Sequence, residues 1–329
     1  MIRADGPSSS PSGSTCNGSF HPVAVSRVEM ATGFFFYELC MTKSRINHLA
    51  CALILLVSLN SVPVLATARD YPTVEEILKR HGESIGNTSG RETAASRVAV
   101  GTSEFILNLP SFHSQGKVLF ASNADNTMLL SSFDLPEYPY EKIGWFRRKI
   151  EIPFIQPGSR SPIGSYLLLN DNLLSERLFG GAICSTWRLL DKNAGERIRF
   201  GGVKRINGEE TFVLRFNVKS ASAGDSGIDI YIHTKTFRHI RTEYRQKIPT
   251  MNIYQTGIFA NQTGENVNKL VEEFDDFRSA DGLMLPHLYK ISLVLDSRAD
   301  TKEFRWIFKF NEYRFGQNFG EDFFTFNKK

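Results

Sequence analysis

Residues 197–218 have the sequence RIRFGGVKRINGEETFVLRFNV, in which two strand-like runs flank the dipeptide Asn207-Gly208. Asn-Gly readily adopts the positive φ angles of a type I′ turn, so the stretch predicts a β-hairpin with arms Arg197–Arg205 and Glu210–Val218. Apolar and polar residues alternate in the second arm, which places an apolar row on one face. The stretch therefore favours an antiparallel sheet with one face turned to a core and a largely polar row on the other.

The chain beyond this hairpin repeats the same kind of signal. About ten runs rich in Val, Ile, Phe, Tyr and Thr follow Arg97, and their spacing between turn signals predicts one large antiparallel sheet. A second turn, at Asp281-Gly282, joins two of the longest runs. The predicted strands after the first hairpin are Ile228–His233, Arg238–Gln246, Val267–Phe277, Leu283–Leu295 and Lys302–Phe315.

The last predicted strand carries an aromatic row in which Phe304, Trp306, Phe308 and Phe310 recur at every second residue. Such a row is ordinary core in most sheets, but a sheet of this length curls and, with few covering helices, leaves an apolar concavity. Core and ligand wall therefore both stay open as roles for these side chains. The candidate wall residues of the concavity are Phe212, Leu214, Phe216, Ile230, Ile232, Trp306, Phe308 and Phe310.

One amphipathic helix is predicted at the start of the folded region. Thr73 and Glu76 form a capping box, and apolar residues recur at helical spacing from Val74 to Ile85. His81 lies on this apolar stripe. Because zinc sites need three or four ligands and no second histidine follows at helical spacing, packing is the favoured interpretation of His81.

The first forty residues differ in composition from the rest of the chain. Asp5–Ser19 is almost entirely Gly, Pro, Ser, Thr and Asn, which cannot bury enough apolar surface to offset the entropy lost on ordering. We therefore expect residues 1–40 to be disordered or to precede the true start of the protein, with Met41 as the predicted start codon.

Residues 41–68 follow the pattern of a secretory signal peptide. Lys43 and Arg45 precede the apolar run Leu49–Leu59, and the small residues Ala-Thr-Ala close the segment. The pattern predicts export to the periplasm and a single mature domain at residues 69–329. A membrane anchor over Leu49–Ala68 is the less favoured alternative, because polar residues and a proline lie within it: Ser58, Asn60, Ser61 and Pro63.

Composition and missing motifs limit the classes of function. Cleavage of the signal leaves Cys184 as the one cysteine, which excludes an intramolecular disulfide and a cysteine-rich zinc site, and we expect this thiol to be buried and inert. A net charge of +4 over 329 residues gives no broad basic surface for nucleic acid. The mature region has no phosphate loop, dinucleotide fingerprint, HExxH motif or nucleophile elbow. We therefore expect no enzyme activity, no cofactor and no metal.

Two charged clusters have both a structural and a functional interpretation. The acidic run EEFDD at residues 272–276 offers metal ligands or an acid–base pair, but strand alternation divides its carboxylates between two faces, which favours a solvated or ion-paired surface. Arg147-Arg148-Lys149 lies in the proline-rich, less regular region Tyr138–Pro162, which is typical of strands flanking a mobile loop. Clustered cations beside apolar residues can meet anionic lipid headgroups or acidic partners.

Four stretches resemble a known family: TVEEILKRHGESIG at 73–86, FGGVKRINGEETFVLRF at 200–216, IDIYIHTKTFRHIRTEYR at 228–245, and VEEFDDFRSADGLMLPHLYKI at 271–291. Together they are similar to LolA/LolB-like outer-membrane lipoprotein-sorting carriers, of which this chain resembles a longer subgroup. The resemblance implies a mainly β fold with flanking helices (α+β). Its strongly curved antiparallel sheet would form a half-open β-barrel lidded by helices, which shelters acyl chains.

The favoured function is therefore a periplasmic carrier or binding protein that holds the acyl chain of a lipoprotein or lipid, with an inner- or outer-membrane protein as a further partner. One alternative is a periplasmic sensor or scaffold that binds a protein segment with the same concavity. Another is a secreted hydrolase whose site has no recognisable motif. Bound lipid, bound protein, or a nucleophile beside a base in a pocket would distinguish the three.

Overall fold

The computed structural model describes residues 71–108, 111–146, 149–171, 175–218, 226–248, 266–296, 301–320 and 322–326. All of them belong to one compact unit, Arg69–Lys329. The predictions for residues 1–40 and for the signal peptide at residues 41–68 lie outside the described residues.

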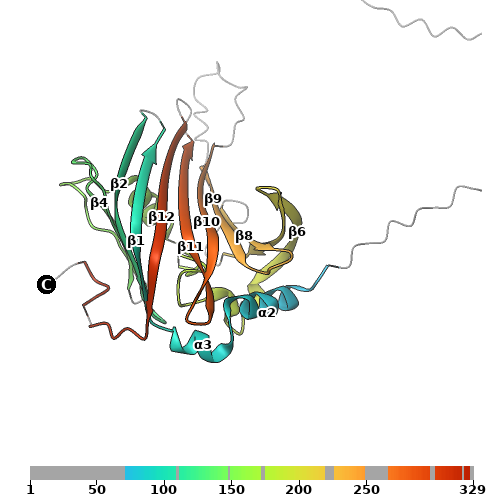
Figure 1. The fold of residues 1–329 in the computed structure, drawn as a ribbon. Coiled ribbons are helices and arrows are strands. Elements are labelled where there is room, and N and C mark those ends of the chain that lie inside the picture. Colours follow the sequence, from blue (N-terminus) through green and yellow to red (C-terminus); the bar gives the residue numbers. More distant parts are fainter. Residues whose placement is uncertain are drawn as a thin grey trace, which may run out of the picture. The chain divides into compact units, whose positions relative to one another are not determined.

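Twelve antiparallel strands form one sheet in the described chain, in the order β5-β4-β3-β2-β1-β12-β11-β10-β9-β8-β7-β6. Neighbours in the sheet are neighbours in sequence, except that the first strand pairs with the last (Figure 1). β5 and β6 are the two edges, so the sheet is not closed into a barrel. The predicted mainly β, half-open antiparallel fold is confirmed. The strands are β1 (Arg97–Leu107), β2 (Phe112–Ser122), β3 (Thr127–Ser132), β4 (Tyr140–Phe146), β5 (Lys149–Glu151), β6 (Ile198–Ile206), β7 (Glu209–Phe216), β8 (Ser226–His233), β9 (His239–Ile248), β10 (Asn266–Ala280), β11 (Leu283–Asp296) and β12 (Thr301–Phe315).

The two predicted turns join β6 to β7 and β10 to β11. Asn207 and Gly208, between β6 and β7, have φ angles of 51° and 89°, and Asp281 and Gly282, between β10 and β11, have 46° and 79°. Two consecutive positive φ angles are the signature of a type I′ turn, whose twist matches that of the strands it joins. Both hairpin predictions are confirmed.

The helices of the described chain are short. α2 (Val74–Ile85) begins where predicted, because the hydroxyl oxygen of Thr73 accepts a hydrogen bond of 3.2 Å from the backbone nitrogen of Glu76. α2 lies with α3 (Thr88–Thr93) at one end of the strands (Figure 1). None of the described helices is long and apolar enough to cross a membrane. The others are α4 (Pro162–Leu169) and the 3-10 turns η1 (Arg188–Leu190) and η2 (Gly195–Arg197).

The chain between β5 and β6, residues 152–197, is called the inner segment here. Its side chains belong to the same core cluster as inward-facing residues of strands from both halves of the sheet, for example Ile143 of β4 and Phe274 of β10. Apart from α4, the two 3-10 turns and the helical residue Asp171, its described residues have no helix or strand. The inner face of the sheet is therefore covered mostly by irregular chain. Its buried apolar residues include Ile163, Tyr166, Leu167, Leu178, Ala182, Ile183, Cys184 and Leu189.

The predicted polar row of β8 lies on the outer face of the sheet, but two of its residues are buried. Asp229 and Tyr231 have only 7% and 1% of their surface exposed. Arg245 forms an ion pair with Asp229, and the Lys204 amine lies 5.7 Å from the centre of the Tyr231 ring. Long charged side chains thus cover part of the outer face with their aliphatic stems, which alternation alone does not predict.

Candidate functional site

The eight predicted wall residues come together in one cluster on the inner face. β7, β8 and β12 position them by alternation, and each has at most 5% of its surface exposed. They pack against the inner segment and against one another, and none of them lines the two pockets described below. These residues are Phe212, Leu214, Phe216, Ile230, Ile232, Trp306, Phe308 and Phe310.

Two glycines bring the inner segment into close contact with the middle of the sheet. Gly180 and Gly181 have φ angles of 80° and 34°, which glycine adopts without steric cost. A Cβ atom on Gly180 would lie 2.6 Å from the ring of Phe120 in β2, and one on Gly181 would lie 2.5 Å from the ring of Phe274 in β10. The Gly-Gly pair therefore lets irregular chain reach across the concave side from β2 to β10.

Glu272 is the main polar anchor between the sheet and the inner segment. Its carboxylate accepts hydrogen bonds from the hydroxyls of Tyr244 at 2.8 Å and Tyr289 at 2.5 Å, and from the backbone nitrogen of Gly180 at 2.7 Å. Glu272 is completely buried, and this burial raises its pKa to about 7. The prediction of a solvated or ion-paired acidic surface is wrong for this residue, because Glu272 shares the inward row of Leu270 and Phe274.

A second set of polar contacts joins residues 184–186 of the inner segment to β2 and β3. The backbone nitrogen of Ser185 donates to the hydroxyl of Ser122 at 2.9 Å. The sulfur of Cys184 lies 3.1 Å from the hydroxyl of Thr127 and 3.2 Å from that of Thr186. Cys184 has 2% of its surface exposed, so its predicted burial is confirmed. A few side-chain contacts, in place of a strand ladder, join this part of the inner segment to the sheet.

A buried glutamate that sequence reasoning missed anchors the start of α4. Glu141 accepts hydrogen bonds from the hydroxyl of Tyr138 and, at 2.8 Å, from that of Ser161, which also caps α4 through Gly164. The Tyr138 hydroxyl in turn accepts one from the Trp306 indole at 2.8 Å. Burial raises the pKa of Glu141 to about 7. The available signal was its place in β4, two residues before the buried Ile143, on the inward row.

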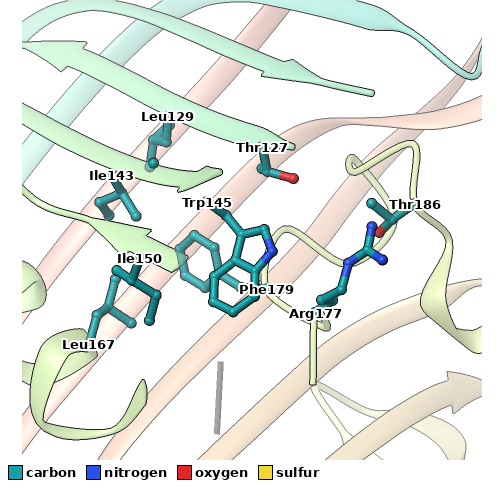
Figure 2. A pocket seen from close by; sticks show the side chains of 10 residues that line it. Thr127, Leu129, Ile143, Trp145, Ile150, Leu167, Arg177, Phe179 and Thr186 are labelled. Carbon is teal, nitrogen blue, oxygen red and sulfur yellow. The ribbon is translucent and has the colours of Figure 1, made fainter. Parts of the chain in front are cut away.

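An apolar pocket lies where the inner segment meets β3, β4 and β5. Figure 2 shows the aliphatic side chains at one side of the Trp145 and Phe179 rings and the polar groups of Arg177 and Thr186 at the other. The cavity measures about 30 Å³, enough for one or two water molecules. The pocket is therefore amphipathic and nearly filled by its own lining. Its lining residues are Thr127, Leu129, Ile143, Gly144, Trp145, Ile150, Leu167, Arg177, Phe179 and Thr186.

Two histidines far apart in sequence lie close together in the structure. The ring centres of His81 and His239 are 6.1 Å apart, and Nε2 of His239 lies 2.8 Å from the hydroxyl of Thr242. Burial lowers the pKa of His81 to about 4 and that of His239 to about 3, so both rings are neutral near pH 7. They line a cavity of about 10 Å³, which holds one water molecule at most. His81 is a packed residue of α2, as predicted.

The remaining predicted charge cluster is described only in part. Arg147 and Arg148 lie outside the described residues, and Lys149 is exposed at the start of β5. In the part of the chain that the structure describes, no group of three or more His, Cys, Asp or Glu residues is placed to hold a metal ion.

Comparisons with known proteins concern the fold. No family model matches the sequence, and no curated protein matches it. Similar solved structures include a LolA superfamily protein of Nitrosomonas europaea, 11% identical, with a TM-score of 0.42, covering 78% of this chain and 98% of that one. A putative outer membrane lipoprotein-sorting protein domain of Vibrio parahaemolyticus is 13% identical, with a TM-score of 0.38 and coverages of 77% and 97%.

A third structure is a complex. One chain of the MucA/MucB complex of Pseudomonas aeruginosa is 9% identical, with a TM-score of 0.21, and the match covers 74% of this chain and 99% of that one. The structural neighbours thus include the group of proteins that the sequence resembles, as predicted. At these identities and TM-scores, the likeness carries no function over to this chain.

Proposed function

We propose that this chain is a periplasmic carrier or binding protein that shelters the acyl chain of a lipid or lipoprotein on the inner face of its open sheet. The observation that carries the proposal is the way this face is covered. An apolar inner face spanning twelve strands is filled by an irregular segment with an amphipathic pocket at its border, instead of by a second sheet or a helical layer.

The size of the pocket decides how such a ligand would bind. Drug-sized and lipid-sized ligands need pockets of about 300–1,000 Å³, and the cavity at Trp145 measures about 30 Å³. An acyl chain therefore enters only if the inner segment moves away from the sheet. The chain would then replace the apolar contacts of that segment, and each methylene it buries contributes about 0.8 kcal/mol.

The eight predicted wall residues acquire a role in this proposal. While the inner segment is in place they are core, and once it moves they become the apolar wall that faces the ligand. Both interpretations of the aromatic row of β12 then hold, each for a different conformation. Phe308, with none of its surface exposed, belongs to this wall.

A reversible disulfide tests whether the inner segment must move. Replacing Thr127 with Cys puts a second sulfur close to that of Cys184, because the hydroxyl it replaces lies 3.1 Å from that sulfur. The experiment uses protein in which Cys16, Cys40 and Cys51 are serine. We expect the oxidised Thr127→Cys protein to lose saturable binding of a fluorescent fatty acid and to recover it on reduction.

The control for this test is Thr127→Ser, which cannot form the disulfide and should bind the fluorescent fatty acid in both oxidised and reduced buffer. Equal binding by the oxidised and reduced Thr127→Cys protein would contradict movement of the inner segment at this point. The absence of saturable binding to the folded, unmodified protein would contradict the carrier function itself.

One observation favours a second candidate, a scaffold that binds a protein segment. β6 is an edge strand of nine residues, and it carries Phe200, which has 36% of its surface exposed. Long edge strands offer unpaired backbone groups to an added strand. Native mass spectrometry of protein purified from its own source distinguishes the candidates, because bound lipid supports the carrier and a stoichiometric protein chain supports the scaffold.

A further inference from the structure

The side chain of Arg97 is buried without a partner for its charge. Arg97 begins β1 and has none of its surface exposed. None of its three side-chain nitrogens has a hydrogen-bond partner among the described residues, and its guanidinium carbon lies 4.3 Å from the centre of the Trp187 ring. A guanidinium stays protonated in proteins and offers five N–H donors. Leaving such a charge buried and uncompensated costs several kcal/mol, so an acceptor is expected there.

Two more buried donors without partners lie beside Arg97. The indole nitrogen belongs to the same Trp187, and the hydroxyl belongs to Ser185. Ser185 is close because its backbone nitrogen bonds to Ser122, which is directly opposite Arg97 in the β1–β2 register. Five polar atoms of three residues thus gather without a carboxylate: the groups that act on Arg97 electrostatically are Cys184 and Tyr313. A set of donors with no anionic acceptor is suited to an oxyanion.

This donor cluster, Arg97 with Ser185 and Trp187, is connected to the amphipathic pocket by a row of residues across three strands. Ser122 pairs with Arg97 on one side and with Thr127 on the other, so the three residues form one row across β1, β2 and β3. Thr127 lines the pocket at its polar side. Neighbouring strands are about 4.8 Å apart, which places the start of the pocket about 10 Å from Arg97.

We propose that the donor cluster binds the oxyanion head of an amphiphile, a carboxylate or a phosphate, whose acyl chain lies in the apolar pocket and along the inner face. This inference rests on the proposed function and adds the chemical class of its ligand. A neutral amphiphile with the same chain leaves the Arg97 charge uncompensated and binds more weakly.

The test compares four probes on the purified protein: dodecanoate, dodecyl phosphate, dodecanol and inorganic phosphate. At neutral pH, we expect the two anionic amphiphiles to bind about 10- to 100-fold more tightly than dodecanol, the range that charge-assisted hydrogen bonds carry. The tighter of the two identifies the head. Arg97→Met should bind all three amphiphiles with similar affinity, and Arg97→Lys, which keeps the charge, should retain part of the preference.

A matched variant separates this site from the cation at the pocket. Arg177 also lines the pocket, and its Nε has no hydrogen-bond partner among the described residues. Because Arg177 lines the pocket for the acyl chain, we expect Arg177→Met to shift the affinities for all three amphiphiles together and to keep the preference for the anionic probes. Loss of the preference in Arg177→Met together with its retention in Arg97→Met would overturn the proposal.

The unliganded variants give a readout that a structural arginine does not share. Because Arg97→Met removes a buried charge without a partner, it should melt at the same temperature as the unmodified protein or higher. A lower melting temperature for both Arg97→Met and Arg97→Lys would show that Arg97 holds the fold and would overturn the proposal.

The probes also separate this inference from the proposed function. Equal affinity of the unmodified protein for dodecanol and dodecanoate leaves the carrier function standing and overturns the anionic head. Binding of inorganic phosphate at Arg97 without binding of any amphiphile overturns both the amphiphilic ligand and the carrier.

Discussion

Positive φ angles fall on different residue types in the two predicted hairpin turns and in the inner segment. In these two hairpins they fall on Asn-Gly and Asp-Gly pairs, which adopt them at little cost, while Phe237, between β8 and β9, is an exception elsewhere in the sheet. In the inner segment they also fall on Arg177 and Trp187. A left-handed conformation costs such residues about 1–2 kcal/mol each. The hairpins are thus locally consistent, whereas tertiary contacts must hold the inner segment in its conformation.

Hydrogen bonding differs in the same direction. Every strand of the sheet except the edge strands β5 and β6 pairs with a neighbour on both sides, so its backbone groups are satisfied along the ladder. The inner segment is joined to the sheet by side-chain anchors such as Glu272 and Ser122 and not by a ladder. Buried side-chain atoms without a partner occur in both regions, so the difference lies in the backbone pairing. Regions without such a ladder open at lower free energy than the global unfolding. We therefore regard the sheet as the stable frame and the inner segment as the part that moves.

Phe308→Ala removes a core side chain of the sheet and should lower the unfolding free energy more than the other variants. Phe308 has none of its surface exposed and its ring centre lies 5.6 Å from that of Tyr289. Truncating a buried phenylalanine costs about 3–5 kcal/mol of unfolding free energy, which urea denaturation followed by far-ultraviolet circular dichroism measures. Phe323→Ala, at a side chain with 38% exposure, is the control. Similar losses for both variants would contradict a core role for the β12 row.

Gly181→Ala separates the two regions. The new Cβ atom would overlap the rings of Phe274 and His239, and the φ angle of 34° is unfavourable for alanine. We expect a loss of about 1–3 kcal/mol that is confined to the inner segment. Limited proteolysis should then cleave residues 176–190 faster while β10 and β11 stay intact. Gly227→Ala is the matched control, because only the end of the Arg245 side chain lies near that position. Uniformly faster cleavage of the sheet would contradict separate stability.

The pH dependence of stability tests the buried titratable groups. The pKa values of Glu141 and Glu272 are raised by burial to about 7, so their contribution to stability falls as pH rises from about 4.5 to 7. The pKa values of His81 and His239 are lowered by burial to about 4 and 3, so their contribution is lost as pH falls below about 6.5. The two pairs oppose each other between pH 4.5 and 6.5.

Glu141→Gln combined with Glu272→Gln removes one side of this balance. We expect the unfolding free energy of the unmodified protein to be nearly flat from pH 4.5 to 6.5. That of the double variant should rise with pH, by up to about 1.4 kcal/mol per pH unit for each histidine proton. Urea titrations at several pH values measure both curves. Parallel curves would show that the glutamates are not protonated in the folded protein.

Thr73→Ala should have the smallest effect and should leave both regions in place. It removes the hydroxyl that accepts the Glu76 backbone hydrogen bond at the start of α2. Loss of an N-cap typically costs about 1 kcal/mol, measured as a shift of the urea midpoint. Thr73→Ser is the control and should restore the stability. A loss comparable to that of Phe308→Ala would mean that α2 belongs to the frame.

Local signals explain which parts of the fold were predictable. The Asn207-Gly208 turn, the alternation of β12 and the Thr73 cap each act over a few residues, and the structure has all three where the sequence predicts them. The inner segment has no such periodicity. Gly180-Gly181 is visible in the sequence, but its contacts with β2 and β10 come from residues far away in the chain.

The sequence predicts which side chains of the candidate site lie on the inner face, but it does not predict which residues they contact. Alternation identified the apolar rows of β7, β8 and β12, because side-chain direction follows from position in a strand. The same alternation placed Glu272 beside Leu270 and Phe274, but its partners Tyr244 and Tyr289 come from other strands, so its burial is a tertiary property. Arg97 gave no signal in the sequence because its isolation depends on Trp187 and Ser185.

Hydrogen exchange resolved along the chain by mass spectrometry, with and without saturating dodecanoate, tests most directly whether the inner segment moves on a stable sheet. The account predicts that amides of residues 176–190 exchange faster than those of β10–β12 in the free protein. It also predicts that dodecanoate speeds their exchange further while it slows exchange in β7 and β12. Equal protection of the inner segment and the strands, unchanged by the ligand, would contradict it.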